Sequence, residues 1–374
     1  LYEALNNVKK VDGNKIIAIA DQFSQASYII ASFADEIILH PSGGVLLTGW
    51  SSKRVFVKDF LDKLDVRVLE FSKGEYKSAT EVFTRSSMSN ESKESNSKLF
   101  NVIWKFTSKS IEKNRNLENG FIENYIQNAL AQNHNNTSMA ELALNNGLVD
   151  KLMTRVEVEK YLADQFPDEK NDWKFIHYRD YEQNSPEKNK NIIGLVSIAG
   201  TILDGSQPRG SAGGENISAM IKEARNEKNL KALVLRVNTP GGSAFASEII
   251  REQVLAIKDR GIPIVVSMGG LAASGGYWIS ADSDYIFAHE SSVTGSIGVA
   301  AILFDAQETI KKIGLNEDGV SNSPFAGSLN NGVLLSSPSE EVVDLIQGNV
   351  DRLYNDFIEI VANGRGISTE EANL

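Results

Sequence analysis

The stretch PIVVSMGGLAASGGYWISADSDYIFAHE, residues 263–290, has a counterpart in KIIAIADQFSQASYIIASFADEIILHP, residues 15–41. Identical residues in and just after the two stretches recur at one offset of 249 positions, without a gap: Tyr28 and Tyr277, Asp35 and Asp284, His40 and His289, and Gly49 and Gly298. Four identities at one ungapped offset indicate that the chain contains two copies of one structural unit.

Each copy has the same order of strand, short turn, helix and strand. Apolar runs predict a first strand at residues 16–20 and 264–268, and a second strand at residues 36–39 and 284–287. Short apolar runs bounded by turn residues are typical of strands buried in a sheet. The alternation of strands and helices predicts an α/β fold with two tandem repeats, largely parallel sheets and flanking helices.

The second copy has additional elements in front of it. We expect strands at residues 191–200 and 232–238, and amphipathic helices at residues 217–231 and 243–261, the last ending at Gly261. The first copy begins where the last of these helices would end, and residues 141–152 have no counterpart before position 374. We therefore expect both repeats to be truncated, the first at its start and the second at its end.

The domain organisation follows from the repeats and from a polar segment between them. Residues 163–190 are rich in charged and polar side chains and contain two prolines, which is typical of a linker. The sequence therefore predicts an N-terminal repeat at residues 1–162, a linker at 163–190 and a C-terminal repeat at 191–374.

Composition excludes several classes of function. The net charge is −11, and no dense Lys/Arg block offsets it, which argues against a nucleic-acid-binding protein. The chain has no cysteine, which excludes disulfides, thiolate zinc sites and cysteine nucleophiles. No stretch of about 18 apolar residues is present, so we expect no transmembrane helix within this sequence.

Ser274 is the first candidate for chemistry. It follows a predicted buried strand and stands at the start of a helix, where unpaired backbone N–H groups and the positive helix end favour an alkoxide. The amide of Gly275 could help to bind an oxyanion there. A serine at a helix start is also a common N-cap, so the local sequence alone leaves a capping role open.

The segment NTPGGS, residues 238–243, also joins a predicted strand to a helix. Paired glycines at a helix N-terminus form an anion-binding turn, so the amides of Gly241 and Gly242 are candidates for an oxyanion hole. The alternative is a tight strand-to-helix turn without chemistry. No Gly-Lys-Ser/Thr follows, which argues against a nucleotide-binding P-loop.

A serine nucleophile needs a base, and histidine is a poor candidate here. His40 and His289 occupy equivalent positions in the two repeats, which favours a structural role, while His134 and His177 lie in polar segments. The sequence therefore indicates a lysine base, which burial among apolar groups would keep neutral by lowering its pKa.

The repeat distinguishes the two roles of Ser274. At the offset of 249, Ser274 corresponds to Gln25, and Ser296 corresponds to Leu47. A serine that served only the framework would have no special reason to differ between the copies, so the asymmetry favours a chemical role.

Spacing alone does not choose the lysine. Lys77, in FSKGEYKSATEVF at residues 71–83, is the preferred candidate. If Gly74 is aligned with Gly319, Lys77 aligns with Asn322 in the other copy. The second copy would then lack the lysine, as the first copy lacks the serine. Lys73 is the nearby competitor. A Ser-x-x-Lys match at Ser95 and Lys98 lies in a highly polar run without the companion motifs of penicillin-binding enzymes, and we expect a solvated helix face there.

Taken together, the duplication and four ordered motifs resemble the long, duplicated form of bacterial signal peptide peptidase A, a serine–lysine peptidase with the crotonase-like fold of the caseinolytic proteases. The motifs are YKSATEVF, RVNTPGGSAFASE, GGLAASGGYWIS and TGSIGV, and the resemblance covers nearly the whole chain. The chain departs from the family at Thr239, where serine is usual before the proline. We expect this change to be silent, because a hydroxyl is retained.

The resemblance implies roles for the site residues. Ser274 would be the nucleophile, Lys77 the general base and acid, and Ser296 the hydroxyl that orients the lysine. Oxyanion donors would come from Gly241 or Gly242 and from Gly275. No metal or organic cofactor would be required.

The resemblance also implies partners and location. It implies a homotetramer on the outer, periplasmic side of the bacterial cytoplasmic (inner) membrane, which degrades signal peptides and other hydrophobic segments. Membrane association would come from an N-terminal segment that this sequence does not contain.

Two other functions remain open at this point. Crotonase-like folds also support acyl-CoA chemistry, which would need a carboxylate at the site, and the nearest is Glu248, about two helical turns along. A non-catalytic scaffold is the other alternative, because Gln25 shows that one copy lacks its serine. Labelling by a serine-reactive phosphonate would separate these alternatives from the peptidase.

Overall fold

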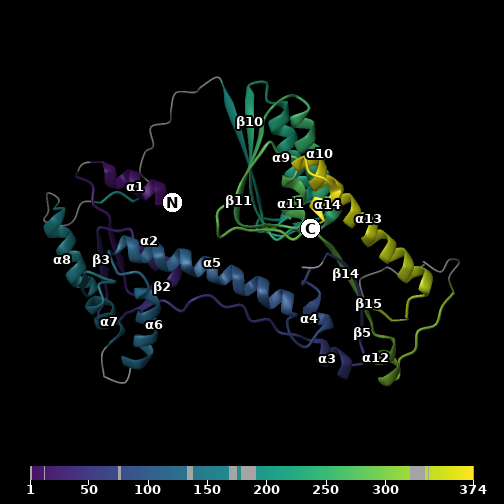
Figure 1. Ribbon diagram of the computed structural model, residues 1–374, viewed down its shortest axis with the longest axis horizontal. Helices are drawn as coiled ribbons and strands as arrows, with labels where there is room; N and C mark the ends of the chain where they lie inside the picture. The colour runs from purple at the N-terminus through teal and green to yellow at the C-terminus, as the bar shows by residue number, and fades with distance from the viewer. Residues whose placement is uncertain are drawn as a thin grey trace. The chain divides into compact units, whose positions relative to one another are not determined.

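The structure, a computed structural model, divides into two compact units that are described separately below (Figure 1). The first unit contains residues 1–51 and 100–186, and the second contains residues 52–99 and 187–374. The described residues are 2–11, 13–74, 77–132, 138–167, 175–177, 191–320, 333–335 and 337–373.

The first unit has a small parallel sheet in the order β1-β3-β6 and a parallel pair formed by β2 and β4. Its strands are β1 (Ile17–Ala20), β2 (Phe23–Ser24), β3 (Glu36–Leu39), β4 (Val45–Leu46) and β6 (Lys151–Leu152). Its helices are α1 (Tyr2–Lys10), α2 (Gln25–Ala31), α6 (Phe121–Gln132), α7 (Met139–Asn145) and α8 (Arg155–Gln165), together with the second part of α5 (Asn90–Asn114).

The core of the first unit packs helix side chains against the sheet. Tyr28 of α2, Ile111 of α5 and Ile122 of α6 are fully buried in one apolar cluster with Ile37 and Leu39 of β3. The four residues of β3 are all buried, as expected for the central strand of a sheet covered on both faces. Burial of these side chains is the main driving force for folding of the unit.

The second unit is built on a five-stranded parallel sheet. Its order is β12-β11-β10-β7, and β13 pairs with the second half of β11. The strands are β7 (Ile192–Ala199), β10 (Leu230–Thr239), β11 (Ile264–Ala273), β12 (Tyr285–Phe287) and β13 (Val293–Gly295). The prediction of a largely parallel α/β fold with flanking helices is confirmed.

Helices α9 (Gly214–Asn226) and α10 (Ala244–Lys258) lie against one face of this sheet (Figure 1). Ile221 of α9 and Ile250 of α10 are fully buried against Leu233 and Leu235 of β10. The short helix α11 (Gly275–Ser280) follows β11 directly, and β8 (Ile202–Leu203) pairs with β9 (Ala212–Gly213) before α9.

A second sheet in this unit has the order β15-β14-β5. The strands β14 (Val299–Asp305) and β5 (Arg67–Lys73) are antiparallel over seven residue pairs, whereas β15 (Val333–Leu334) is parallel to β14. The remaining helices of the unit are α3 (Lys58–Lys63), α4 (Glu81–Thr84), α12 (Gln307–Lys312), α13 (Glu340–Arg365) and α14 (Thr369–Ala372), together with the first part of α5.

The pairing of β5 with β14 explains why the compact units differ from the repeats along the chain. Residues 52–99 belong to the predicted N-terminal repeat at 1–162, yet they fold with the second unit. The repeat boundaries stay a prediction. The predicted linker at 163–190 begins inside α8, and most of it lies outside the described residues.

The local structure of the two repeats matches at the offset of 249. The pairs Phe23–Val45 and Ser24–Leu46 between β2 and β4 correspond to the pairs Ala272–Thr294 and Ala273–Gly295 between β11 and β13. Helix α2 begins at Gln25 and α11 at Gly275, one residue from equivalence. This correspondence is what two copies of one unit predict.

No helix in the described ranges carries an apolar stretch of the length needed to cross a bilayer.

Candidate functional site

Ser274 stands at a strained turn between a strand and a helix in the second unit. Strand β11 ends at Ala273 and helix α11 begins at Gly275, and Ser274 between them has φ 53° and ψ −119°. Such a conformation is rare for a residue with a Cβ and costs about 1–3 kcal/mol. The turn is held in place by the Ser274 N–H, which donates to Gly295 O at 2.8 Å.

This geometry is unlike that of a capping serine. The hydroxyl caps of four other helices have extended backbones with φ between −67° and −73°, and each accepts a hydrogen bond from an amide three residues later: Ser24, Ser138, Thr154 and Ser368. The Ser274 side chain forms no such bond in α11. The capping role left open by the sequence therefore does not account for Ser274, whose Oγ faces a cavity instead.

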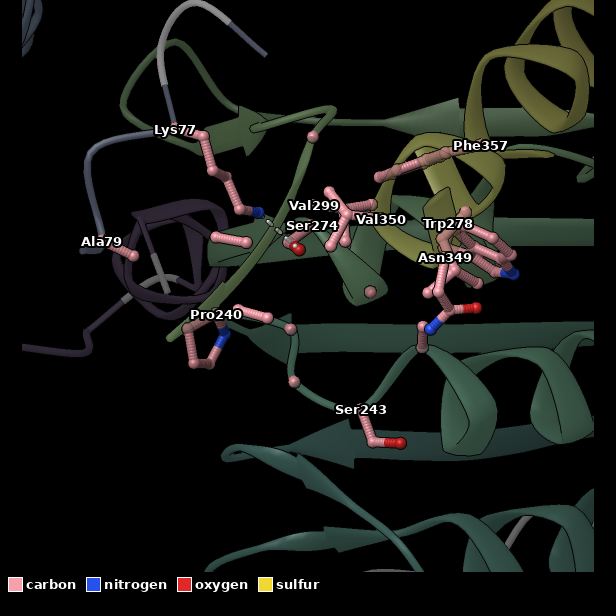
Figure 2. Close-up of a pocket in the computed structure, with 18 of the residues that line it drawn as sticks. Lys77, Ala79, Pro240, Ser243, Ser274, Trp278, Val299, Asn349, Val350 and Phe357 are labelled. Atoms are coloured by element: carbon pink, nitrogen blue, oxygen red, sulfur yellow. Dashed lines mark hydrogen bonds between the residues drawn. The ribbon is translucent and has the colours of Figure 1, made fainter. Parts of the chain in front are cut away.

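Lys77 is the partner of Ser274. Its Nζ lies 2.9 Å from Ser274 Oγ, within hydrogen-bond distance, and Figure 2 shows the side chain pointing at the hydroxyl. Burial lowers the pKa of Lys77 from 10.5 to about 8, because the surroundings disfavour the charged form. Both residues belong to the second unit.

Ser296 also lies close to the lysine. Its carbonyl oxygen and its Oγ are each 3.4 Å from Lys77 Nζ, at the long end of hydrogen-bond distances. Like Ser274, Ser296 has a positive φ, 52°, although it is not glycine. Strained backbone of this kind tends to gather at functional sites, and here it is found at both serines that contact the lysine.

The competing lysine is held elsewhere. Lys73 Nζ forms an ion pair with Asp351 of α13 at 3.1 Å and lies 5.5 Å from the centre of the Tyr354 ring. The structure thus brings Lys77, and not Lys73, to Ser274. The sequence favours Lys77 because it aligns with Asn322 of the other repeat. This alignment is not compared with the structure, because Asn322 lies outside the described residues.

The glycine turn after β10 lies directly against Ser274. A Cβ on Gly241 would be 2.6 Å from the Gly275 nitrogen and 2.7 Å from the Ser274 Cβ, so only glycine fits. Gly241 and Gly242 also have positive φ, 93° and 153°. The predicted anion-binding turn therefore forms next to the serine.

The three predicted donor glycines differ in their hydrogen bonds. The Gly241 N–H donates to Thr239 Oγ1 at 3.0 Å. Among the described residues, the N–H groups of Gly242 and Gly275 have no hydrogen-bond acceptor. The latter two amides are therefore available to a ligand, and the sequence could not separate them from Gly241.

Thr239 explains the one departure from the family motif. Its side chain is fully buried, and its hydroxyl accepts the Gly241 N–H, while its methyl group packs near Gly276. A serine hydroxyl could accept the same bond, which agrees with the expectation that the change is silent.

A cavity of about 900 Å³ opens in front of Ser274 and Lys77 (Figure 2). One wall consists of Gly298 and the first residues of β14. Another comes from α13, which was not predicted from the sequence to belong to the site. Its lining residues are Leu345, Ile346, Asn349, Val350, Leu353 and Phe357. Their spacing of three and four residues is the signal that could have revealed this apolar face.

The equivalent position in the first repeat has a structural side chain. The Gln25 Oε1 accepts the N–H groups of Thr48 and Gly49, at 3.1 and 2.9 Å, and its Nε2 donates to Gly49 O. Gln25 thus bridges the helix start to the segment after β4. In the second repeat, Lys77 lies beside the equivalent residue, Gly298.

The histidines behave as expected of framework residues. His40 Nδ1 accepts the Ser42 N–H, and His289 Nδ1 accepts the Ser291 N–H, which is the equivalent contact at the offset of 249. His177 is exposed, and His134 lies outside the described residues.

Two other candidates from the sequence lie away from the serine. Lys98 pairs with Glu94 at 2.6 Å on an exposed face of α5, as predicted for the Ser95 and Lys98 match. The Glu248 carboxylate accepts Trp278 Nε1–H and pairs with Arg251, and Glu248 does not line the cavity at Ser274. In the described part of the chain, no group of three or more histidine, aspartate or glutamate side chains is arranged to hold a metal.

The chain is similar to several known proteins. The chain is 38% identical to Protease 4 of Haemophilus influenzae over 96% of its own length, and 38% identical to Protease 4 of Salmonella typhi, also over 96%. It spans 59% and 58% of the lengths of these two relatives. It is also 34% identical to the "Putative signal peptide peptidase SppA" of Enterococcus faecium, over 48% of this chain and 53% of that protein.

A family model gives the same assignment. The model described as "Peptidase family S49" matches residues 8–166 and 256–373, which is more than half of the chain and includes Lys77, Ser274 and Ser296. The chain therefore belongs to peptidase family S49.

Proposed function

We propose that this chain is a serine-type endopeptidase that uses a Ser274–Lys77 dyad. The main support is the 2.9 Å contact between Lys77 Nζ and Ser274 Oγ, combined with a lysine pKa of about 8. With that pKa, a fraction of about one in ten of the lysines is neutral at pH 7 and can accept a proton.

The proposed reaction is acyl transfer. Neutral Lys77 takes the proton of the Ser274 hydroxyl as Oγ attacks the carbonyl carbon of the peptide. The lysine then gives that proton to the leaving amine, and the acyl group stays on Ser274 as an ester. Water, deprotonated by the same lysine, attacks the ester. The bond to Ser274 Oγ then breaks, the lysine returns the proton to Oγ, and the second product leaves as a carboxylic acid. Ser296 would orient the lysine through its two 3.4 Å contacts.

The amides of Gly242 and Gly275 are the proposed donors to the tetrahedral oxyanion, with Gly241 supporting the turn. Both amides lie beside Ser274 and have no acceptor among the described residues. Gly275 is the first residue of α11, so the positive end of the helix adds to its donor strength. One such donor contributes about 10²–10³ in rate in other enzymes.

The proposed substrates are cleaved signal peptides and other hydrophobic segments. The cavity beside Ser274 is lined mostly by apolar side chains, including Val299, Val350 and Phe357, which suits an apolar peptide. The name of the Enterococcus faecium relative, a putative signal peptide peptidase, points to the same substrate class. Assembly into a homotetramer and action at the outer side of the bacterial inner membrane are proposed from the family resemblance.

A serine-reactive phosphonate and a hydrophobic peptide test the dyad together. We expect the phosphonate to label Ser274, and Ser274→Ala and Lys77→Ala to lose at least about 10³-fold in kcat/KM while circular dichroism stays unchanged. Ser95→Ala and Lys98→Ala, the exposed Ser-x-x-Lys match, are the controls and should keep full activity. Full activity in either dyad variant would overturn the proposed dyad. A wild-type chain that takes no label and cleaves no peptide would favour a non-catalytic scaffold.

The acyl-CoA alternative has little support. It needs a carboxylate at the reacting centre, and Glu248, the candidate from the sequence, is bound to Trp278 and Arg251. Among the described residues, no aspartate or glutamate lines the cavity at Ser274.

A further inference from the structure

Trp278 lies one helical turn after Ser274 and borders two cavities of the second unit. The backbone N–H of Trp278 donates to Ser274 O at 2.9 Å. Residues four apart in a helix share a face. Trp278 lines the cavity of about 900 Å³ at Ser274, and it also lines a second cavity of about 630 Å³. Ala244, Asn349 and Leu353 border both cavities as well, so the two are neighbours.

The two cavities differ in their chemistry. The walls that the first cavity receives from β14 and α13 are mainly apolar, among them Val299, Ala301 and Val350. The second cavity is rich in charged side chains, which are Glu248, Arg251, Arg352, Asp356 and Glu359. An apolar substrate side chain therefore fits the first cavity and not the second.

The indole of Trp278 is held firmly between the cavities. It is 5% exposed, and its ring packs on Phe357 of α13 with the ring centres 4.8 Å apart. Its Nε1–H donates to Glu248 Oε2 at 2.7 Å. In Figure 2, Lys77 lies on one side of Ser274, and Trp278 and Phe357 lie on the other.

Glu248 is itself fixed by an ionic chain. Arg251, one turn along α10, donates to Glu248 Oε1 at 2.8 Å and to Asp282 Oδ2 at 2.5 Å. Asp282 is buried just after α11, so the chain connects α10 to the end of the helix that carries Trp278. Paired and largely buried charges of this kind hold their geometry well, because breaking one leaves another unpaired.

We propose that Trp278 sets the depth of the apolar pocket beside Ser274 and so limits the size of the substrate side chain that precedes the cleaved bond. Glu248 is a positioning residue that fixes the indole through its Nε1–H. The inference rests on the proposed peptidase function and adds the determinant of its size preference. Leucine-sized side chains fit above the indole, whereas fused aromatic side chains meet it.

The test compares peptides that differ only at this position, with leucine or 2-naphthylalanine, and mass spectrometry identifies the cleaved bond. We expect the wild-type chain to favour leucine. Trp278→Ala should raise the naphthylalanine-to-leucine ratio of kcat/KM at least about 10-fold, since removing the indole deepens the apolar pocket. Trp278→Phe should give an intermediate ratio. Trp104→Ala, in the first unit and bordering neither cavity, is the matched control and should leave the ratio unchanged.

A double-mutant comparison tests Glu248. Glu248→Ala should raise the ratio about 3-fold in the wild-type background, because the indole loses its acceptor and moves more freely. The same change should have no effect in the Trp278→Phe background, since phenylalanine has no N–H to hold. An equal effect in both backgrounds would show that Glu248 acts otherwise than through the indole.

The outcomes separate this inference from the function on which it rests. A phosphonate titration counts active Ser274 in every variant, which corrects for any misfolded fraction. Labelled Trp278→Ala and Trp278→Phe variants that cleave with the wild-type ratio would overturn the inference and leave the peptidase standing. A wild-type chain that takes no label and cleaves no peptide would overturn both.

Discussion

At the scale of single residues, the site depends on a lysine whose charge is disfavoured by its surroundings. Among the described residues no carboxylate pairs with Lys77, and burial is the cause of its lowered pKa, about 8. Lys73, by contrast, is partly exposed and pairs with Asp351. The burial that would let Lys77 act as the proposed base should therefore lower the stability of the fold.

Lys77→Met should abolish activity and stabilise the second unit at pH 7 by about 2 kcal/mol. The folded chain holds the Lys77 proton with a pKa of about 8 and the unfolded chain with a pKa near 10.5, so the unfolded state binds more protons between these values. Wild-type stability therefore rises with pH from about 8 to 10.5. The difference in free energy of unfolding between the methionine variant and the wild type should be largest below pH 8 and should decrease above it.

Urea unfolding at pH 7 and pH 9.5, followed by tryptophan fluorescence, measures this difference. Lys73→Met is the matched control, because Lys73 is partly exposed and ion-paired, and its replacement should give no such gain at pH 7. A methionine variant at position 77 that is no more stable than wild type at pH 7 would contradict the account of the lowered pKa.

The two serines show what the sequence could and could not reveal at this scale. Ser274 and Ser296 stood out because the first repeat has Gln25 and Leu47 in their places. The positive φ of Ser274 accompanies a bond to a separate segment, from its N–H to Gly295 O, whereas the Gly241 N–H bonds to Thr239 within the same turn. Local patterns do not encode the contact with Gly295, and the sequence alone does not show that the Gly241 amide already has an acceptor while the Gly242 amide has none among the described residues.

At the scale of elements, the apolar runs predicted where the strands of the second unit lie, but they predicted the ends of these strands less accurately. The prediction for residues 264–268 identified β11, but the strand continues to Ala273 through the segment GGLAA. Glycine and alanine have weak strand propensity, and this half forms because β10 and β13 pair with it. Tertiary pairing thus extends the strand up to Ser274.

The wall formed by α13 and the pairing of β5 with β14 were not predicted. The antiparallel register sets Lys73 opposite Val299, more than 200 positions along the chain, and sequence patterns carry little information about such distant partners. This pairing brings the segment after β5, with Lys77, to the serine. The choice of Lys77 over Lys73 is therefore a consequence of topology.

The position of α13 predicts the effect of a charge at the cavity wall. Leu345 lines the cavity and is 50% exposed, so Leu345→Asp adds a carboxylate there without disturbing the core. We expect kcat/KM for an apolar peptide to fall about 10-fold, mainly through KM, because the peptide must desolvate the new charge. Steady-state kinetics on one hydrophobic peptide measures the change.

Gly348→Asp is the matched control for Leu345→Asp. It adds the same charge at an exposed position of the same helix, and Gly348 does not line the cavity. The control should stay within about 2-fold of wild type, as surface substitutions usually do. If both variants lose activity equally, the effect comes from the net charge and α13 is not a wall of the substrate site.

At the scale of the whole molecule, two copies of one local motif carry different side chains at equivalent positions, and these side chains make different contacts. In the second copy the helix start holds a strained serine that contacts a lysine, whereas in the first it holds Gln25, bonded to Thr48 and Gly49. The repeat made this contrast visible in the sequence. The assignment of Lys77 to the same compact unit as Ser274, however, required the fold, because position along the chain assigns it to the other repeat.

The contrast predicts that restoring the hydroxyls of the first repeat does not create a second site. Gln25→Ser, alone or with Leu47→Ser, should leave phosphonate labelling at one per chain, because a serine without a neutral lysine beside it is a weak nucleophile. The variant should instead lower the stability of the first unit by about 1–3 kcal/mol, since the amides of Thr48 and Gly49 lose their acceptor.

Combining Gln25→Ser with Ser274→Ala supplies the control, and intact-mass measurement should then find no label. Two labels per chain in the single variant, or one in the combined variant, would show that the first repeat supplies a base of its own, and the dyad would no longer be unique to the second unit.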